Sequence, residues 1–348
     1  MTMTQKPLLI TMGDAAGIGP EIIAKAFRES PAEMNNCLVV GDVETMRRAA
    51  QLTAVSPSLS IAHVNALENL PGIPPNCIGV LQKCELTTLV PFGQINALAG
   101  RAAADCIVWA ARAVLAGQTA GMVTAPIHKE ALAAAGGWAA QFPGHTEMLQ
   151  AEAAAFLSRP LSNVPVRMML ANDELKTVLV SIHMSLRNAI EAVTFDSVLQ
   201  TLRITHLALS ASLGLAPRIA VAGLNPHAGE GGLFGSEEQN IIAPAIAAAR
   251  AEGLNVSGPF APDTVFMRAR RRGGKLGEFD VVVAMYHDQG LIPVKYLGVE
   301  QGVNVTLGLP LVRTSPDHGT AFDIAGTGRA DASSLVAAVR MARQLAQC

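Results

Sequence analysis

Short apolar runs alternate along this chain with longer Ala-rich segments in which apolar residues recur at helical spacing. The runs contain almost no polar residues, as is typical of strands that are buried on both faces of a sheet. They lie at residues 8–12, 37–41, 121–125, 166–170, 176–182, 218–224, 280–285 and 302–307. Helices are predicted at Asn96–Ala116, followed by Gly117, and at Ser236–Ala251, followed closely by Gly253. This alternation predicts an α/β fold with helices on both faces of the sheet.

Length and composition restrict the class of protein further. A chain of 348 residues, 50% hydrophobic and 16% charged, is expected to form two domains with a large core. The net charge of −2 gives no electrostatic reason to bind nucleic acid or an anionic membrane. No apolar stretch is long and unbroken enough for a membrane helix, and the first residues lack the apolar region of a signal peptide. Five scattered cysteines without a C-x-x-C pair predict a reduced, cytoplasmic protein.

A glycine-rich turn follows the first predicted strand, in the stretch ITMGDAAGIGPEI from Ile10 to Ile22. It is not a dinucleotide fingerprint, because Ile22 stands where the third glycine of G-x-G-x-x-G is needed. It is not a P-loop either, since no Gly-Lys-Ser/Thr follows. The pattern predicts a strand, a tight turn and a helix that opens with Pro20 and Glu21. A turn that lines a ligand and a plain strand-to-helix turn both fit these residues.

Three of the eight histidines directly follow predicted strands. They are His183 after TVLVSI, His227 after RIAVAGLNP and His287 after DVVVAMY. Ligands of α/β proteins bind beyond the carboxyl ends of the strands, where three imidazoles could hold a divalent metal ion. A lone histidine at a strand end more often has a structural role, so both alternatives stay open for the set.

Other polar stretches also suggest a site. PGHTEML brings His145 and Thr146 to a turn that faces a ligand, or Thr146 instead caps a helix there. Lys295 and Arg313 suit a phosphate or carboxylate, although each could be an ordinary surface charge. The stretch from Ser315 to Asp331 is either a binding loop that leads into a helix or a long connector. The basic run at residues 268–278 is expected to be a solvated loop.

Taken together, these stretches resemble one family over nearly the whole chain. GDAAGIGPEI, TAPIHK, FPGHTE, SIHMSLR, GLNPHAGEGG, AMYHDQGLIPVKY, GVNVTLGLPLVRTSPDHGTAFDIAG and GRAD occur in this order from Gly13 to Asp331. Each motif alone would be weak, but the ordered set is similar to the 4-hydroxythreonine-4-phosphate dehydrogenase family. GIGPEI and DHGTAFDIAG also resemble the wider isocitrate and isopropylmalate dehydrogenase fold, which binds its dinucleotide without G-x-G-x-x-G.

The resemblance implies two α/β/α domains and a homodimer. The first domain is expected at residues 1–135 with 318–348, and the second at 136–317 with the metal site and the dimer interface. The active site would lie in the cleft between the domains, with a contribution from the partner subunit. No nucleic acid or membrane partner is implied.

The resemblance also implies roles for residues that match the family motifs. The metal ligands would be His183, His227 and His287. The substrate would contact His145, Thr146, Lys295, Asn304 and Arg313, and the catalytic groups would be Lys295, Asp288 and Asp263. The cofactor would contact His318, Gly319, Asp323, Gly17 and Gly19.

The implied reaction is an oxidation followed by a decarboxylation, dependent on NAD or NADP and on one divalent metal ion such as Zn, Mg, Mn or Co. The expected substrate is 4-phosphohydroxy-L-threonine, converted to 3-amino-2-oxopropyl phosphate in pyridoxal phosphate biosynthesis. The metal lowers the pKa of the substrate hydroxyl, and Lys295 or a metal-linked group takes the proton.

Departures from the commoner family pattern keep a sister group open. Ala15 and Ser185 each replace a proline, and Asn172 replaces a glycine. These changes are similar to those of enzymes that oxidise D-threonate or D-erythronate 4-phosphate to dihydroxyacetone phosphate. A non-catalytic protein that binds a phosphorylated ligand is a further alternative. A cis-dihydrodiol dehydrogenase is another alternative. Such an enzyme would not need side chains that bind a phosphate, so the presence of these side chains disfavours it.

Overall fold

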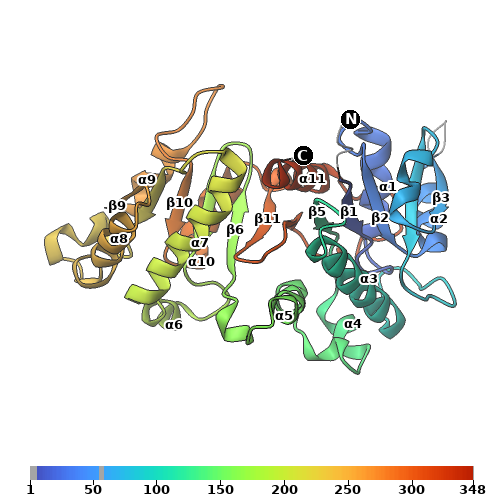
Figure 1. Cartoon of the computed structure of the whole chain (residues 1–348), viewed down its shortest axis with the longest axis horizontal. Coiled ribbons are helices and arrows are strands. Elements are labelled where there is room, and N and C mark those ends of the chain that lie inside the picture. The colour runs from blue at the N-terminus through green and yellow to red at the C-terminus, as the bar shows by residue number, and fades with distance from the viewer. Residues whose placement is uncertain (1–5, 55–58, 348) are drawn as a thin grey trace. The chain divides into compact units, whose positions relative to one another are not determined.

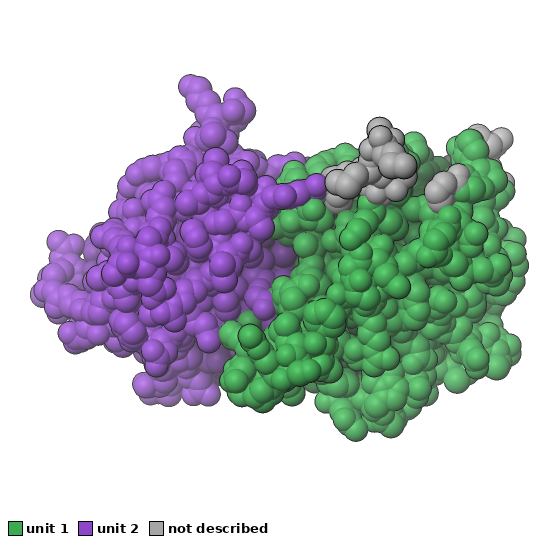
Figure 2. Space-filling model, in the orientation of Figure 1, with its two compact units in different colours: residues 1–165, 309–346, 348 green, residues 166–308, 347 purple. Residues whose placement is uncertain are grey.

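The structure is a computed structural model of the chain, and it describes residues 6–54 and 59–347. It divides into two compact units. Unit 1 contains the chain up to Pro165 together with Leu309–Ala346, and unit 2 contains Val166–Gly308 (Figure 2). Each unit consists of a β-sheet with helices packed on it, so the predicted α/β class is confirmed (Figure 1).

The sheet of unit 1 is made of parallel strands in the order β3-β4-β2-β1-β5-β12. Their bounds are β1 (Leu8–Thr11), β2 (Cys37–Gly41), β3 (Ser60–Val64), β4 (Cys77–Gln82), β5 (Gly121–Thr124) and β12 (Arg313–Pro316). Leu8 pairs with Cys37 on one side and Gly121 on the other, so β1, β2 and β5 reach the same edge with their carboxyl ends. All residues of these three strands are buried, as their apolar sequences predict.

The helices of unit 1 are α1 (Gly19–Glu29), α2 (Val43–Leu52), α3 (Ala97–Leu115), α4 (Lys129–Ala134), α5 (His145–Leu157) and α11 (Ser333–Ala346). Helix α3 packs on β1, β2 and β5, and α11 packs on β12, β5 and β1 (Figure 1). The prediction of a helix at residues 96–116 is confirmed, because the Asn96 side chain caps α3 by accepting the backbone N–H groups of Leu98 and Ala99.

The sheet of unit 2 has the strand order β11-β6-β7-β10-β8-β9. The bounds are β6 (Arg167–Ala171), β7 (Lys176–Leu179), β8 (Ile219–Ala222), β9 (Val256–Phe260), β10 (Val281–Ala284) and β11 (Val303–Leu307). Strands β7, β10, β8 and β9 run parallel, whereas β6 runs antiparallel to both of its neighbours, β7 and β11. The carboxyl ends of β7, β10 and β8 therefore lie side by side.

The helices of unit 2 are α6 (Leu186–Glu191), α7 (Phe195–Leu213), α8 (Ala243–Ala251), α9 (Pro262–Ala269) and α10 (His287–Tyr296). Helix α10 packs on β7, β10 and β6, while α7 contacts β7 and β11. The helix predicted at residues 236–251 is present, but it begins with a π-helical turn, η5 (Glu238–Ile242), before α8. π-Helical turns of this kind often occur at functional sites.

Every strand that the apolar runs predicted is present, and β3, β4, β9 and β12 were missed. The missed strands lack a continuous apolar pattern: β3 is partly exposed, β4 and β9 contain glycine, and β12 has the polar sequence RTSP. The basic run at 268–278 is mostly exposed, as expected, and turns at Gly273 and Gly274, which both have positive φ. No helix among the described residues meets the length and hydropathy needed to cross a membrane.

The observed boundaries between the units differ from the expected domain boundaries. They lie at 165/166 and 308/309 instead of 135/136 and 317/318. Two contacts explain the difference: α5 packs on α3, and β12 pairs with β5. As a result His145, Thr146 and Arg313 belong to unit 1, whereas His183, His227 and His287 belong to unit 2.

Candidate functional site

The strand order of unit 2 brings the three strand-end histidines to one edge of the sheet. His183 follows β7, His287 follows β10 and His227 follows β8, and these strands are consecutive neighbours. Neighbouring strands lie about 4.8 Å apart. The segments that follow β7 and β10 also stay next to each other, because the Ser181 amide and hydroxyl both donate to the carbonyl of Met285, at 3.2 and 2.9 Å.

The rings of His183 and His287 lie next to each other, with 5.7 Å between their centroids. His287 is the first residue of α10, and its Nδ1 lies 2.7 Å from Oδ1 of Asp288. A carboxylate on one ring nitrogen leaves Nε2 as the atom with a free lone pair, which is the usual arrangement of a metal-binding histidine. These two side chains therefore have the donor chemistry of a metal site.

A cavity of about 680 Å³ lies beside these histidines in unit 2. It is lined by His227, Asp263 and Asp288, by Tyr286 and Gln289, and by apolar residues that include Met267, Ile292 and Tyr296. The Gln289 side chain fixes the two neighbouring strand ends, because it accepts the Met285 amide and donates to the Gly223 carbonyl, both at 2.7 Å. The cavity thus combines an imidazole and two carboxylates with an apolar wall.

The backbone around His227 has an uncommon conformation. His227, Ala228, Gly229, Glu230 and Gly231 all have positive φ, within the turn η4 (Pro226–Gly232). Left-handed backbone costs free energy for residues other than glycine, so surrounding contacts must hold it in place.

Glu238 of the π-helical turn η5 supplies those contacts. Its carboxylate is buried and accepts the backbone N–H groups of Leu224 and Asn225 at 2.7 Å each, and the Asn225 side chain at 3.0 Å. A side chain at Gly229 would place its Cβ 2.7 Å from Oε2 of Glu238, so this position requires glycine. Glu238 therefore determines the path of the chain that leads into His227.

Among the residues that the structure describes, no three His, Cys, Asp or Glu side chains form a ready metal-binding group. His183 and His287 are adjacent, and His227 lines the cavity beside Asp288. The three-histidine metal site thus stays a prediction, in which the His227 turn has to close on the other two ligands.

The remaining predicted residues of unit 2 lie away from the lining of this cavity. Lys295 is in the last turn of α10, about 12 Å along the helix axis from His287 at 1.5 Å per residue. It is exposed. Asn304 is half-buried in β11, opposite Leu170 of β6. Their contacts with substrate stay predictions.

In unit 1, the structure brings Arg313 and His145 together. Arg313 is 4% exposed, and its guanidinium donates to the Thr124 hydroxyl at the carboxyl end of β5, with distances of 2.7 and 3.0 Å. Burial lowers the pKa of Arg313 to about 10, while Glu147 opposes this shift. The guanidinium is therefore still a cation near neutral pH, as an anion site requires.

His145 is expected to be neutral beside this cation. Burial first, and then the charge of Arg313, lower the pKa of His145 well below its ordinary value, although a backbone hydrogen bond at Ala125 opposes them. Nε2 of His145 is buried and has no hydrogen-bond partner among the described residues. A neutral imidazole with an unused nitrogen next to a buried guanidinium suits a polar anionic ligand.

The alternative that Thr146 caps a helix is wrong. Helix α5 begins at His145, its N-cap is Gly144, and no side chain caps it. Thr146 is half-buried in the first turn. His145 and Thr146 both lie at a helix N-terminus, where the backbone N–H groups favour anions.

The glycines of the first turn are explained by packing within unit 1. A side chain at Gly19 would place Cβ 2.4 Å from the Met12 carbonyl oxygen, and one at Gly17 would place it 3.0 Å from Thr320. The plain strand-to-helix turn therefore accounts for Gly17 and Gly19 without a ligand. Their role in cofactor binding stays a prediction.

The stretch after β12 is a long connector without helix or strand that runs to α11 at Ser333. His318, Gly319 and Asp323 are exposed in it, and Gly319 has open space at its Cβ position. Phe322 stacks on the ring of His128 with 4.6 Å between the centroids. The connector thus presents polar groups from a fixed backbone, as a binding loop would.

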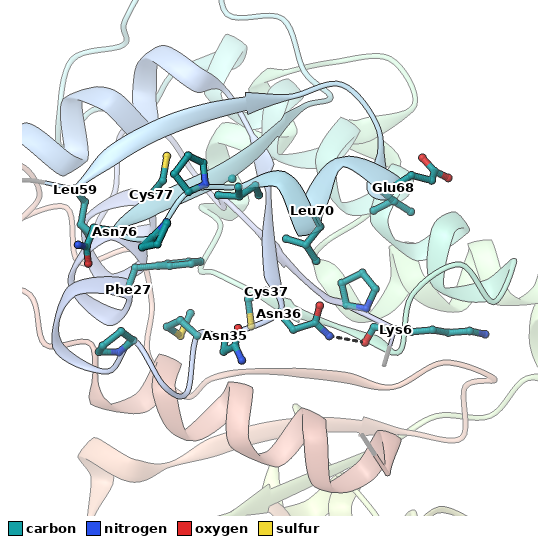
Figure 3. Close-up of a pocket in the computed structure, with 18 of the residues that line it drawn as sticks. Lys6, Phe27, Asn35, Asn36, Cys37, Leu59, Glu68, Leu70, Asn76 and Cys77 are labelled. Atoms are coloured by element: carbon teal, nitrogen blue, oxygen red, sulfur yellow. Dashed lines mark hydrogen bonds between the residues drawn. The ribbon is translucent and has the colours of Figure 1, made fainter. Parts of the chain in front are cut away.

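A larger cavity, of about 990 Å³, lies at the opposite edge of the unit 1 sheet (Figure 3). Cys37 and Cys77, the first residues of β2 and β4, line it together with Phe27, Leu70 and Asn76. None of the residues that the sequence analysis assigned to a site lines this cavity. The candidate chemistry is therefore at the carboxyl edges of the sheets and not in this cavity.

Three residues with a role at these sites were not predicted, namely Glu238, Thr124 and Gln289. Each is polar, and each hydrogen-bonds to a residue at the end of a neighbouring strand. Gln289 follows a predicted strand by four residues, which is a pattern that could have found it, whereas Thr124 lies inside a predicted strand and Glu238 inside a predicted helix.

Comparisons with known proteins agree with this arrangement. The protein-family model described as "Pyridoxal phosphate biosynthetic protein PdxA" matches residues 33–342. The 4-hydroxythreonine-4-phosphate dehydrogenase of Beijerinckia indica subsp. indica is 53% identical, over 99% of this chain and 96% of that protein. The D-threonate 4-phosphate dehydrogenase of Salmonella typhimurium is 42% identical, over 99% and 100% of the two chains.

Solved structures give the same result. The crystal structure of 4-hydroxythreonine-4-phosphate dehydrogenase from Klebsiella pneumoniae matches with a TM-score of 0.85 and 40% sequence identity. The match covers 99% of this chain and 100% of that one. The similarity therefore extends over both units and is not restricted to a single motif.

Proposed function

Since this chain belongs to the pyridoxal phosphate biosynthetic protein PdxA family, we propose that it is a metal-dependent and NAD(P)-dependent dehydrogenase. It oxidises the hydroxyl group of a phosphorylated 3-hydroxy acid and removes the carboxylate as carbon dioxide. The substrate is 4-phosphohydroxy-L-threonine and the product is 3-amino-2-oxopropyl phosphate. The relative named 4-hydroxythreonine-4-phosphate dehydrogenase is 53% identical to this chain, whereas the one named D-threonate 4-phosphate dehydrogenase is 42% identical. This difference supports 4-phosphohydroxy-L-threonine over D-threonate 4-phosphate as the substrate.

One observation carries the proposal: unit 2 gathers imidazoles and carboxylates at the carboxyl ends of β7, β10 and β8. The His183 and His287 rings are 5.7 Å apart, and His227, Asp263 and Asp288 line the adjoining cavity. Imidazole nitrogens suit Zn, Co and Mn, and the carboxylates also suit Mg. When bound, the metal ion polarises the substrate hydroxyl and the dinucleotide accepts the hydride.

The protein's own groups bind and orient the substrate. Asp288 holds the His287 ring through Nδ1 and directs Nε2 outward. Lys295, Asp263 and Asp288 are the proposed groups for proton transfer, with Lys295 or a metal-linked group as the base that takes the hydroxyl proton. His145, Thr146, Lys295, Asn304 and Arg313 are the proposed substrate contacts, and the buried Arg313 cation suits an anionic end of the substrate.

The exposed His318, Gly319 and Asp323 of the connector after β12 are the proposed contacts of the dinucleotide, with Gly17 and Gly19 shaping the turn beside it. The open space at Gly319 supports a close approach of a ligand to the backbone there.

We further propose that the protein is a cytoplasmic homodimer whose second copy covers part of unit 2. Met267, Ile292 and Tyr296 support this proposal, since they are 68%, 63% and 90% exposed and line the candidate cavity. A contiguous exposed apolar patch beside a site is typical of an interface. Cys37, Cys77, Cys84 and Cys106 are all free thiols, which fits the reducing cytoplasm.

A kinetic comparison tests the proposed function. NADH or NADPH formation is followed by absorbance with 4-phosphohydroxy-L-threonine and with D-threonate 4-phosphate, before and after addition of a chelator. The expected result is a higher kcat/KM with 4-phosphohydroxy-L-threonine and loss of turnover with the chelator. The reverse order of the two substrates assigns the protein to the D-threonate group instead.

His227→Ala tests the metal role separately. The variant is expected to keep the circular-dichroism spectrum of the wild type and to lose metal-dependent turnover by at least about a hundredfold. Unchanged turnover in the variant, or with the chelator, rules out the assigned metal site. Binding of the phosphorylated compound without any NAD(P)H formation would favour the non-catalytic alternative.

A further inference from the structure

The connector between β12 and α11 is fixed by residues of unit 1 that lie far away in the sequence. Long segments without regular structure are usually either mobile or shaped for a function. Here the Ile18 amide donates to the Thr320 carbonyl at 3.0 Å, and Phe322 stacks on His128. Both contacts hold the first half of the connector.

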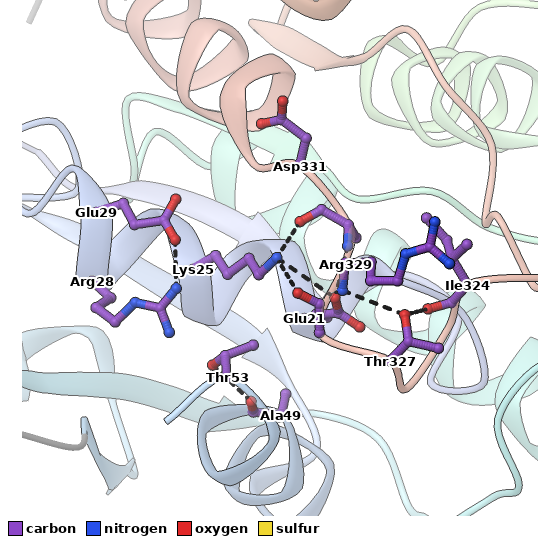
Figure 4. A network of polar contacts seen from close by, with 12 residues as sticks. Glu21, Lys25, Arg28, Glu29, Ala49, Thr53, Ile324, Thr327, Arg329 and Asp331 are labelled. Atoms are coloured by element: carbon purple, nitrogen blue, oxygen red, sulfur yellow. Dashed lines mark hydrogen bonds and ion pairs between the residues drawn. The ribbon is translucent and has the colours of Figure 1, made fainter. Parts of the chain in front are cut away.

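Two side chains of α1 hold the second half (Figure 4). The Lys25 ammonium donates to the carbonyl oxygens of Gly328 and Ala330 at 2.6 and 2.5 Å. The Glu21 carboxylate accepts the backbone N–H of Ala330 at 3.0 Å and lies 3.9 Å from the Lys25 ammonium. Residues that are four apart on a helix lie on the same face, so Glu21 and Lys25 meet the connector together.

The hydrogen bonds to the connector involve two charged side chains, and both side chains are shielded from water. Glu21 is 2% exposed, and Lys25 is half-buried. Charge-assisted hydrogen bonds to backbone groups are shorter and stronger than neutral ones. Because all partners in the connector are backbone atoms, the pair fixes the shape of this segment and not the identity of its side chains.

Of the side chains that the connector exposes, His318 lies two residues before the first fixed point, Thr320, and Asp323 lies between Phe322 and Gly328. His318 and Asp323 are exposed, whereas Thr320 and Ala330 are buried. If the backbone of the connector were mobile, these exposed groups would have no fixed positions. Ordering them when a ligand binds would then cost conformational entropy. A connector that is fixed beforehand avoids this cost.

We propose that Glu21 and Lys25 are positioning residues for the dinucleotide, which hold the connector at residues 317–332 in the shape that presents His318 and Asp323. The inference rests on the proposed function, in which the connector binds the dinucleotide. In this arrangement the motif GIGPEI contacts two distant motifs, since Glu21 accepts the Ala330 amide of GRAD and the Ile18 amide donates to the Thr320 carbonyl of DHGTAFDIAG.

The test uses Lys25→Met, with Arg28→Met as the matched control. Arg28 lies one turn further along α1 and bonds to its neighbour Glu29 instead of the connector (Figure 4). Hydrogen exchange of the amides at 318–330 is measured on the protein alone. NADH and NADPH binding is then measured by fluorescence titration without substrate.

Lys25→Met is expected to speed exchange in the connector and to raise the Kd of the bound dinucleotide about tenfold, because two charge-assisted hydrogen bonds are lost. KM for the phosphorylated substrate should change less than about twofold. Arg28→Met should leave all three quantities at their wild-type values.

If Lys25→Met does not fold, Glu21→Gln replaces it, with faster exchange at Ala330 and an increase in Kd of about threefold. Faster exchange with an unchanged Kd overturns the inference, as does unchanged exchange in the variants that fold. Failure of the wild type to bind either dinucleotide is a different result, since it refutes the cofactor of the proposed function itself.

Discussion

Burial lowers the pKa of two residues of unit 1, Arg313 and His145, with different results for their charge. Arg313 keeps its charge although burial lowers its pKa to about 10, and the same cation helps to keep His145 neutral. Thr124 holds the guanidinium in place through its hydroxyl. A buried cation beside a neutral imidazole suits an anionic ligand, because the guanidinium supplies the positive charge and the imidazole supplies a nitrogen for hydrogen bonding.

The lowered pKa of His145 predicts how stability depends on pH. Since the unfolded chain has the ordinary His pKa of about 6.5, it binds more protons than the folded chain below that pH. The contribution of neutral His145 to stability is therefore fully present above about pH 6.5 and is lost as the pH falls below that value. The variant His145→Asn lacks the imidazole that takes up a proton on unfolding. The Tm of this variant should therefore fall less than that of the wild type between about pH 7 and pH 5.

The control for this measurement is His63→Asn, at an exposed position of β3 in the same unit. Its Tm should follow the wild-type pH profile. An equally steep pH profile in His145→Asn and the wild type would show that His145 is not the buried neutral group inferred from its surroundings.

At the scale of elements, polar side chains hold strand ends and helix starts in place. Two of the three residues that depart from the commoner family pattern, Ser185 and Asn172, belong to this class. Ser185 caps α6 by accepting the Asn188 amide at 3.3 Å, and Asn172 accepts the amides of Glu174 and Leu175 at 2.9 and 2.8 Å. Ser185 and Asn172 thus have structural roles that account for these two residues without a change of substrate.

Asn172→Gly, which restores the commoner residue, tests this conclusion. The Asn172 side chain also donates to the Val294 carbonyl in α10 at 3.1 Å. Loss of these bonds should cost about 2 kcal/mol and lower Tm by about 5 °C. The ratio of kcat/KM for the two phosphorylated substrates should stay within about twofold of the wild type. A tenfold shift in that ratio would make Asn172 a specificity determinant after all.

The π-helical turn η5 leads to a second prediction at this scale. In Glu238→Gln one oxygen can still accept the two backbone N–H groups, but the amide N–H₂ group then faces the Asn225 side-chain donor, so the turn that carries His227 should be held less firmly. Metal affinity, measured by calorimetry, is expected to fall about 10- to 100-fold. Glu237→Gln is the control, because Glu237 bonds only to the Asn225 side chain in this network and should change affinity less. Equal affinities in Glu238→Gln and the wild type would remove Glu238 from the metal site.

At the scale of the whole molecule, the proposed chemistry is divided between the two compact units. Unit 2 supplies imidazoles and carboxylates, and unit 1 supplies the buried cation, the neutral histidine and the fixed connector. Each unit buries its strands completely at the site edge, so each can present its groups on a rigid frame.

The proposed homodimer is tested by Ile292→Glu, which puts a charge into the exposed apolar patch of unit 2. The wild type should sediment as a dimer, and the variant should shift toward the monomer, since a charge without a partner opposes burial. Phe156→Glu, at a 55% exposed position in unit 1, is the control and should sediment like the wild type. A wild type that sediments as a monomer would contradict the dimer directly.

The sequence by itself determined the fold class, the family and most strands of both units, because buried parallel strands and ordered motifs are local patterns. It also singled out His183, His227 and His287, since each directly follows a strand. Strand order is not local: only the tertiary structure decided that β7, β10 and β8 are neighbours, which places His183 beside His287. It also decided the unit boundaries, the burial that sets the charge of His145, and the contacts of Glu21, Lys25 and Glu238, because these depend on packing between distant segments.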